Sequence, residues 1–200
     1  MAWKLDTNHS HVGFSARHLM ISTVRGHFDK VTVESHIDDK EIDKVHDKGM
    51  LTEDDFLNSH LTVTIDAASI NTGQADRDNH LRSPDFFDVA KYPTIIFKMT
   101  RGVKIDDTHG QMIGDLTIRN VTKPVTLNVE FLGQAKSPLG TVNAGFVGEA
   151  KISRKDWGLE WNVAMETGGW MVSDEIKLDI EVEFVQVPDA VPAQTEKQTA

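Results

Sequence analysis

The residues near the start of the chain that are best suited to chemistry are one carboxylate and two imidazoles, those of Asp6, His9 and His11. Side chains of these types are the ligands with which proteins hold zinc or iron. Because alternate residues of a strand point to one face, His9 and His11 are expected to lie on the same side of a strand here. The other histidines are scattered and no HExxH motif occurs, so metal binding stays an alternative and no metal site is predicted.

Ser10 directly precedes His11, which brings a serine hydrolase or a lipid isomerase into question. Neighbouring residues of a strand point to opposite faces, so these two side chains cannot form the hydrogen-bonded pair that activates a nucleophile. The chain has no GxSxG elbow, no phosphate-binding glycine loop and no dinucleotide fingerprint. The absence of cysteine also excludes disulfides, thiolate zinc sites, iron–sulfur clusters and cysteine nucleophiles. An enzyme acting on a small lipid is a minority interpretation, and no catalytic residue is predicted.

A second group of polar residues, Arg77, His80 and Arg82, lies in the one long central stretch without alternation, from Gly73 to Pro93. Guanidinium and imidazole groups could hold a quinone carbonyl or a carboxylate head group. Arg77 and Asp78 could instead pair with each other and fix the loop, which is the favoured interpretation of Arg77. His80 is the better candidate for a head group, since a neutral imidazole can donate or accept a hydrogen bond.

The same stretch predicts a short helical lid. Ser83 is followed by Pro84, a pattern typical of a helix N-cap with proline at the first helical position, and then by Phe86 and Phe87. A helical segment that presents two adjacent phenylalanines suits a lid over one mouth of a barrel. The few aromatic residues otherwise gather where a pocket would need them, at Phe146, Trp157, Trp161 and Trp170.

The elements that position these residues are strands, because the dominant pattern elsewhere is alternation of apolar and polar residues. Eight or nine such runs are separated by turn residues. Examples of their apolar positions are Val12, Phe14 and Ala16; Val31, Val33 and Ile37; Leu61, Val63 and Ile65; Ile95, Phe97 and Met99; Val125, Leu127, Val129 and Phe131; and Ile176, Leu178, Ile180, Val182 and Phe184. Short alternating strands without a βαβ rhythm predict an antiparallel sandwich or barrel. Glycines within or beside strands, at 13, 26, 114, 145 and 148, favour the barrel.

The charge of the chain is unevenly distributed. With 21 basic and 31 acidic side chains the 200 residues carry a net charge of −10, which opposes nucleic-acid binding because no basic stripe is present. Half of that charge belongs to residues 38–58, where eight acidic and three basic side chains occur. We interpret this segment as an acidic, solvated insertion. Calcium binding or docking of a basic partner are its alternatives.

The two ends of the chain predict little structure. Residues 188–200 contain two prolines, no aromatic residue and no periodicity, which is typical of a disordered tail, so the domain is expected to cover residues 1–187. No window approaches a membrane span. The start of the chain has no signal-peptide pattern. The expected location is therefore cytoplasmic if Met1 is the native start, and periplasmic if a signal peptide was removed.

Several motifs together resemble one family. Residues 77–93, RDNHLRSPDFFDVAKYP, are similar to the signature of the YceI-like family, lipocalin-like barrels known as polyisoprenoid- or lipid-binding proteins. Further matching segments occur in the family's order at 3–28, 61–72, 114–129, the run from Ile152 to Gly158, and 172–184. Trp157 stands where the family usually has phenylalanine, which would change the shape of the pocket if its side chain faced the cavity.

The resemblance implies an all-β fold, an eight-stranded antiparallel barrel that encloses an elongated apolar cavity for a long isoprenoid or fatty chain. We therefore expect a non-enzymatic protein that sequesters or carries such a lipid, and no cofactor besides it. A homodimer is also implied, for which the residues offer no physical argument. The expected ligand-binding residues are Phe14, His18, Phe28, Arg77, His80, Leu81, Phe86, Phe87, Phe146, Trp157 and Trp170.

Overall fold

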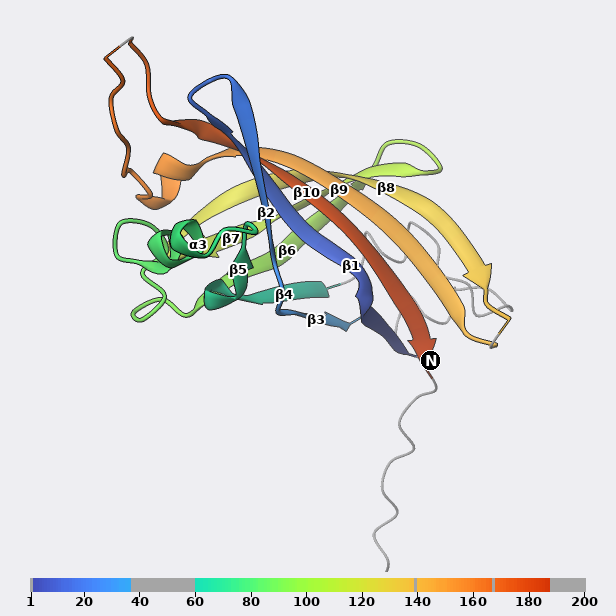
Figure 1. Cartoon of the computed structure of the whole chain (residues 1–200). Helices are drawn as coiled ribbons and strands as arrows, with labels where there is room; N and C mark the ends of the chain where they lie inside the picture. The colour runs from blue at the N-terminus through green and yellow to red at the C-terminus, as the bar shows by residue number, and fades with distance from the viewer. Residues whose placement is uncertain (1, 37–59, 139, 167, 188–200) are drawn as a thin grey trace, which may run out of the picture.

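The computed structural model describes residues 2–36, 60–138, 140–166 and 168–187, which form one curled antiparallel sheet with a few short helical segments (Figure 1). The predicted acidic insertion 38–58, the tail 188–200 and Ile37 lie outside the described residues. The strands are β1 (Ala2–His18), β2 (Ser22–Phe28), β3 (Val31–His36), β4 (His60–Asp66), β5 (Ile70–Asn71), β6 (Thr94–Lys104), β7 (His109–Ile118), β8 (Val121–Lys136), β9 (Val142–Ser153) and β10 (Val172–Val187).

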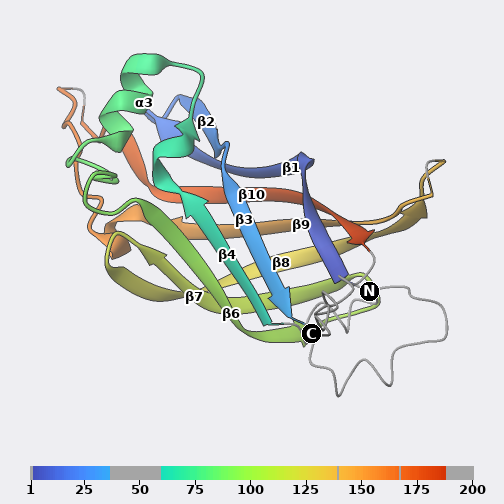
Figure 2. The same ribbon diagram turned by 90° about the horizontal axis from the view of Figure 1, so that it is seen from below.

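The order of strands in the sheet is β3-β4-β6-β7-β8-β9-β10-β1-β2-β5. Strands β2 and β3, which lie toward opposite edges of this order, are joined directly through Asp29 and Lys30. The backbone N–H of Asp29 donates to the carbonyl of Ser69 (3.1 Å) and that of Asp66 to the carbonyl of Lys30 (3.0 Å). If β2 and β3 count as one interrupted strand and the two-residue β5 is set aside, the ten strands become eight. The predicted all-β, eight-stranded antiparallel barrel is confirmed in this form, as one strongly curled sheet (Figure 2).

Alternation along the strands decides which side chains face the inside of the curled sheet, also in strands for which no alternating run was predicted. Along β7, Met112, Leu116 and Ile118 are buried, and along β9 Ala144 and Phe146 are. Because side chains of a strand alternate between faces, these buried positions form one apolar inner wall. Figure 1 shows that α3 and the turn between β1 and β2 lie toward one end of the sheet, away from the N-terminus. We refer to this as the α3 end.

The lid helix lies earlier in the chain than predicted. The helix α3 runs from Ala75 to Arg82, and Ser83 is its C-cap rather than an N-cap. The side chain of Gln74 caps the N-terminus by accepting the N–H of Arg77. Pro84 forces the residue before it into an extended conformation, and Ser83 has φ −72° and ψ 170°, so the Ser-Pro pair ends the helix. None of the described helices has the length and apolarity that a membrane crossing requires.

Candidate functional site

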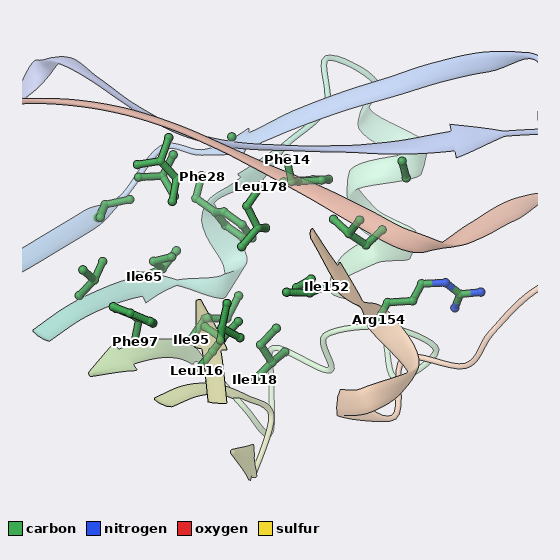
Figure 3. A pocket seen from close by; sticks show the side chains of 18 of the residues that line it. Phe14, Phe28, Ile65, Ile95, Phe97, Leu116, Ile118, Ile152, Arg154 and Leu178 are labelled. Atoms are coloured by element: carbon green, nitrogen blue, oxygen red, sulfur yellow. The ribbon is translucent and has the colours of Figure 1, made fainter. Parts of the chain in front are cut away.

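An apolar cavity of about 600 Å³ occupies the hollow of the sheet. Its wall comes from strands far apart in sequence, and Figure 3 shows side chains from several of them pointing toward a common space. Representative wall residues are Phe28, Ile65, Ile95, Phe97, Leu116, Ile118, Ile152 and Leu178. Cavities of several hundred cubic ångströms with apolar walls are typical of sites for small molecules and cofactors.

Nine of the eleven residues that the sequence predicts for ligand binding line this cavity. They are Phe14, His18, Phe28, Arg77, His80, Leu81, Phe86, Phe87 and Phe146. Phe86 and Phe87 lie in the segment that follows α3, and the ring of Phe87 meets that of Phe28 edge-on at 6.0 Å between centroids. The predicted lid phenylalanines therefore connect to the sheet, although from outside the helix itself. Contact of these nine residues with a ligand stays a prediction.

Two predicted residues do not line the cavity. Trp157 belongs to the short helix η2 (Arg154–Trp157), where it is almost fully buried and donates its indole N–H to the carbonyl of Leu116 (3.0 Å). It packs as a core residue, so its replacement of phenylalanine does not narrow the pocket. Trp170 is 52% exposed and forms an isolated bridge with Ala164. Both positions were predicted because they are aromatic and lie in the same part of the sequence as other aromatic residues. Neither criterion shows which way a side chain points.

Polar side chains gather where α3 meets the sheet. The Arg77 guanidinium donates to Thr72 through Nε to Oγ1 (2.7 Å) and through Nη2 to the carbonyl (2.8 Å). The buried carboxylate of Asp78 accepts from the backbone N–H of Thr72 (2.9 Å) and from its hydroxyl. The predicted pairing of Arg77 with Asp78 is therefore not what fixes the loop. Both side chains instead bond to Thr72, and the loop is fixed through that residue.

Replacing Asp78 by alanine is expected to lower the free energy of unfolding by about 1–3 kcal/mol, because the backbone N–H of Thr72 loses its buried acceptor. Denaturant unfolding followed by circular dichroism measures the change. Asp76, exposed in the first turn of the same helix, is the matched control, and Asp76→Ala should stay within about 0.5 kcal/mol of the wild type. Equal effects of the two substitutions would contradict this role of Asp78.

His80 links the lid to a second loop. Its Nε2 lies 2.9 Å from Asp85 Oδ2, and its ring meets those of Phe86 and Trp161 edge-on, with centroids 5.1 and 4.6 Å apart. Trp161 also lines the cavity but is not among the predicted site residues. Arg82 anchors the same helix by donating to the carbonyls of Ala68 (2.8 Å) and Ile70 (2.7 Å). These contacts place an imidazole at the α3 end of the cavity.

Arg154 is the clearest cavity residue that the sequence did not reveal. It is 4% exposed, although it carries a full charge. Its guanidinium donates to the carbonyls of Ser173, Leu159 and Trp161 and to the carboxylate of Asp174 (3.0 Å). Figure 3 shows Arg154 at the margin of the group of apolar side chains. An arginine that follows a strand carries no sequence signal for burial, since this residue type is usually exposed.

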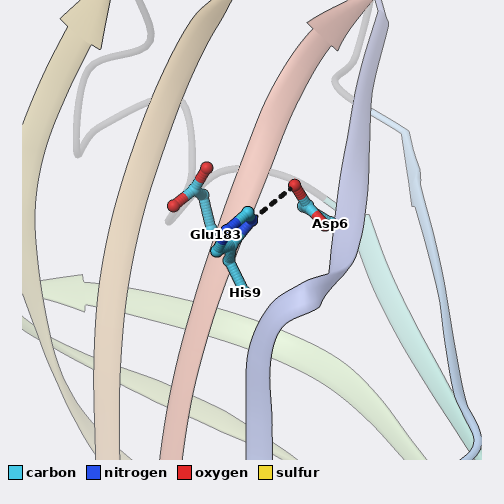
Figure 4. A group of neighbouring side chains, drawn as sticks. All are labelled: Asp6, His9 and Glu183. Atoms are coloured by element: carbon cyan, nitrogen blue, oxygen red, sulfur yellow. Dashed lines mark hydrogen bonds and ion pairs between the residues drawn. The ribbon is translucent and has the colours of Figure 1, made fainter. Parts of the chain in front are cut away.

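A separate cluster on the outer surface joins Asp6, His9 and Glu183 (Figure 4). Their ligand atoms lie within 4.8 Å of one another, and a histidine with two carboxylates could hold a metal ion. The expected pairing of His9 with His11 is not part of this cluster, because His11 packs against the ring of His27 (5.3 Å between centroids). Pairing between β1 and β10 shifts register between Asp6 and His11, so simple alternation does not hold there. Ser10 Oγ accepts the backbone N–H of Glu183 (3.1 Å).

The pair of Asp6 and His9 is expected to titrate at shifted pH values. The hydrogen bond to Asp6 and its negative charge, and then that of Glu183, raise the pKa of His9 above 6.5. The hydrogen bond to His9 and then that to the N–H of Asn8 lower the pKa of Asp6 below 3.8. The stabilising effect of His9 is complete below pH 6.5 and is lost as the pH rises through the raised pKa, whereas that of Asp6 is complete above pH 3.8 and is lost as the pH falls through the lowered pKa. Both contributions to stability are therefore complete only between pH 3.8 and pH 6.5.

A proton NMR titration of the His9 ring tests this prediction. Its midpoint should lie above 6.5 in the wild type and move down toward that value in Asp6→Asn. Glu183→Gln, which removes the more weakly acting charge, should move it less. A midpoint that does not respond to Asp6→Asn would show that the pair does not form in solution.

Comparison with known proteins identifies the family of this fold. The model of the YceI-like domain matches residues 3–184. A UPF0312 protein of Staphylococcus aureus is 37% identical over 182 residues, which cover 90% of this chain and 94% of that protein. The solved YCEI protein of Campylobacter jejuni superposes with a TM-score of 0.67 at 35% identity and covers 94% of this chain and 99% of its own.

A more distant solved structure shares the fold alone. It is a polyisoprenoid binding domain from Saccharophagus degradans, with a TM-score of 0.60 at 18% identity over 94% of this chain and 99% of that one. The resemblance inferred from the sequence motifs is confirmed by the match over residues 3–184 and by the 37% identity to the staphylococcal relative. The chain belongs to the YceI-like family.

Proposed function

We propose that the cavity binds one long-chain apolar lipid, an isoprenoid such as a quinone tail or a fatty-acid derivative, and that the protein sequesters or carries it. The observation that carries this proposal is the apolar cavity of about 600 Å³, whose wall is built from inward-facing strand residues and whose polar lining gathers at the α3 end. Burial of a chain in such a space contributes about 0.8 kcal/mol for each methylene removed from water. No polar partner is needed along the length of the lipid chain.

The polar end of the cavity suits a head group. His18, Arg77 and His80 line it at this end, and His80 can donate or accept a hydrogen bond. Arg77 is held by Thr72, so a ligand would meet an arginine that is already oriented. A quinone carbonyl or a carboxylate at the α3 end would satisfy these donors, with the apolar chain directed into the hollow.

One solved structure with the same fold agrees with this proposal. The Saccharophagus degradans domain that shares this fold is described as polyisoprenoid binding. Its low identity means that its ligand does not transfer by likeness alone, and the apolar wall of the present chain is the independent support.

Organic extraction of the purified protein followed by mass spectrometry tests the proposal. The expected result is a prenyl or acyl lipid in about equimolar amount, and uptake of an added prenyl quinone by protein from which lipid has been removed. A protein that contains no lipid and takes up neither prenyl quinones nor fatty acids would overturn it. Chemical conversion of the added lipid would instead favour the enzymatic alternative.

A further inference from the structure

Large apolar side chains are exposed at the α3 end. Met20 is 56% exposed and Ile21 79%, both in the turn between β1 and β2, and Val163 and Trp170 are 42% and 52% exposed in the loop between η2 and β10. A backbone hydrogen bond from Leu19 N–H to the Met171 carbonyl (2.8 Å) joins the turn to the loop, and within the loop Met171 N–H donates to the Val163 carbonyl (2.9 Å). We call Met20, Ile21, Val163 and Trp170 the apolar tip.

The backbone conformation of this turn does not favour the large apolar residues that occupy it. The N–H of Ile21 donates to the carbonyl of His18 (3.1 Å), and the two residues between them, Leu19 and Met20, have φ of 52° and 61°. Turns with positive φ at both central positions are dominated by glycine, asparagine and aspartate, because larger side chains are strained there. Leucine and methionine occupy these positions against their backbone preference, so a requirement other than the turn accounts for the apolar side chains.

The apolar tip is continuous with the cavity. His18, which directly precedes the turn, and Met171 and Val172, which directly follow Trp170, line the cavity. Trp161, from the same loop, lines it too and contacts His80 of the lid. Figure 1 shows both segments projecting beyond the sheet on the side of α3. A surface that covers the tip would therefore lie next to the end of the cavity where the polar lining gathers.

The charges beside the tip suit a surface of phospholipid head groups. Arg17 donates to the carbonyl of Met20 (3.3 Å), and the pairing of β1 with β2 places Arg17 diagonally across from Arg25 on the same face, both exposed. Cations just behind exposed apolar residues are typical of segments that lie in a membrane interface, where tryptophan is also enriched. Between Val163 and Trp170 the only acidic residue is Glu166.

We propose that the apolar tip docks on the surface of a phospholipid bilayer and so brings the α3 end of the cavity to the reservoir from which a long-chain lipid enters and to which it returns. This inference rests on the proposed function for the nature of the cargo. A lipid that is too apolar to cross water freely has its source in a bilayer, and docking shortens the path between bilayer and cavity. Tip side chains enter the interface, and Arg17 and Arg25 face the phosphates.

Flotation with vesicles of phosphatidylcholine, with and without phosphatidylglycerol, tests the docking step. The double variant Met20→Gly/Ile21→Thr removes two tip side chains and also relieves the positive φ at Met20, so it is expected to fold. Docking would bury these exposed side chains in the bilayer interface, so the loss of each one should weaken vesicle binding about tenfold. The matched control is Ile105→Thr/Leu132→Ser, which removes two side chains of similar exposure (60% and 56%) outside the tip and should bind like the wild type.

Three results would overturn the proposal. The first is a wild type that does not float with either vesicle, and the second is equal flotation of the tip and control variants. The third is sedimentation that shows a wild-type dimer and a monomeric tip variant, because the tip would then be an interface between two copies.

Transfer kinetics separate docking from cargo binding. The tip variant should bind detergent-solubilised prenyl quinone as tightly as the wild type but take it up from vesicles more slowly. Docking without any quinone binding would contradict the proposed function and leave docking intact, whereas quinone binding without docking would contradict this inference alone.

Discussion

Replacing Gly148 by phenylalanine is expected to shorten the cavity and to weaken binding of long lipids while shorter ones still bind. Gly148 is a buried residue of β9 that lines the cavity. A Cβ atom added there would lie 3.7 Å from Ile180 Cβ and 3.7 Å from Leu127 Cδ2, which are ordinary van der Waals distances, so the backbone accepts a side chain. Each methylene that no longer fits costs about 0.8 kcal/mol, so two excluded methylenes weaken binding about tenfold.

A series of prenyl or acyl ligands of increasing length, bound to wild type and variant and quantified by mass spectrometry, measures this effect. The control is Gly145→Phe, three residues earlier on β9, whose side chain points to the opposite face of the sheet. A Cβ atom at Gly145 would meet the exposed Leu132 at 3.5 Å, outside the cavity. If both variants bind ligands of the same length as the wild type, the cavity is not where the chain of the ligand lies.

Arg154→Met is expected to lower the free energy of unfolding by about 3 kcal/mol. The substitution keeps an apolar stem of similar length but leaves the carbonyls of Leu159, Trp161 and Ser173 without their donor. Breaking a buried ion pair costs about 3–5 kcal/mol, and the lower end applies because Asp174 is 40% exposed and keeps Lys155 (2.8 Å) as a partner. At about 2–4 °C per kcal/mol for a domain of this size, the melting temperature should fall by roughly 6–12 °C.

Thermal and denaturant unfolding followed by circular dichroism tests the role of Arg154. Lys155→Met removes the neighbouring cation, which pairs with the same carboxylate but is exposed, and should cost at most about 1 kcal/mol. The wild-type guanidinium uses four of its five N–H groups on the protein. It therefore holds η2 and the following loop against β10. A loss equal to that of Lys155→Met would show that these bonds contribute little.

The strands were predictable from the sequence because a strand with one buried face has a local signature. The alternation through Leu127 and Val129, or through Leu178 and Ile180, fixes which residues share a face without knowledge of any neighbour. The lid was only partly predictable. Its position between strands is right, but its helix ends at Ser83 instead of beginning there. Serine before proline is compatible with either end of a helix, and Gln74, which caps this one, is not among the strongest N-cap residues.

The site residues divide in the same way. Phe14 lies on a strand whose apolar face was predicted, Phe28 and Phe146 were predicted as ligand-binding residues, and the structure places all three on the cavity wall. Trp157 and Trp170 lie in irregular segments, where the direction of a side chain follows from tertiary contacts such as the bond from Trp157 to the Leu116 carbonyl. The burial of Arg154 depends on acceptors from residues 159, 161, 173 and 174, so no local pattern announces it.

By itself, the sequence determined the fold class, the inner face of the clearly alternating strands and the family, because period-two alternation and ordered motifs are local properties of the chain. The tertiary structure alone decided that the inner faces enclose a hollow of about 600 Å³ instead of a filled core, and that the apolar tip, α3 and Arg154 meet at one end of it. The physical reason is that the curl of a sheet and the space inside it depend on how side chains from distant strands fill a shared volume.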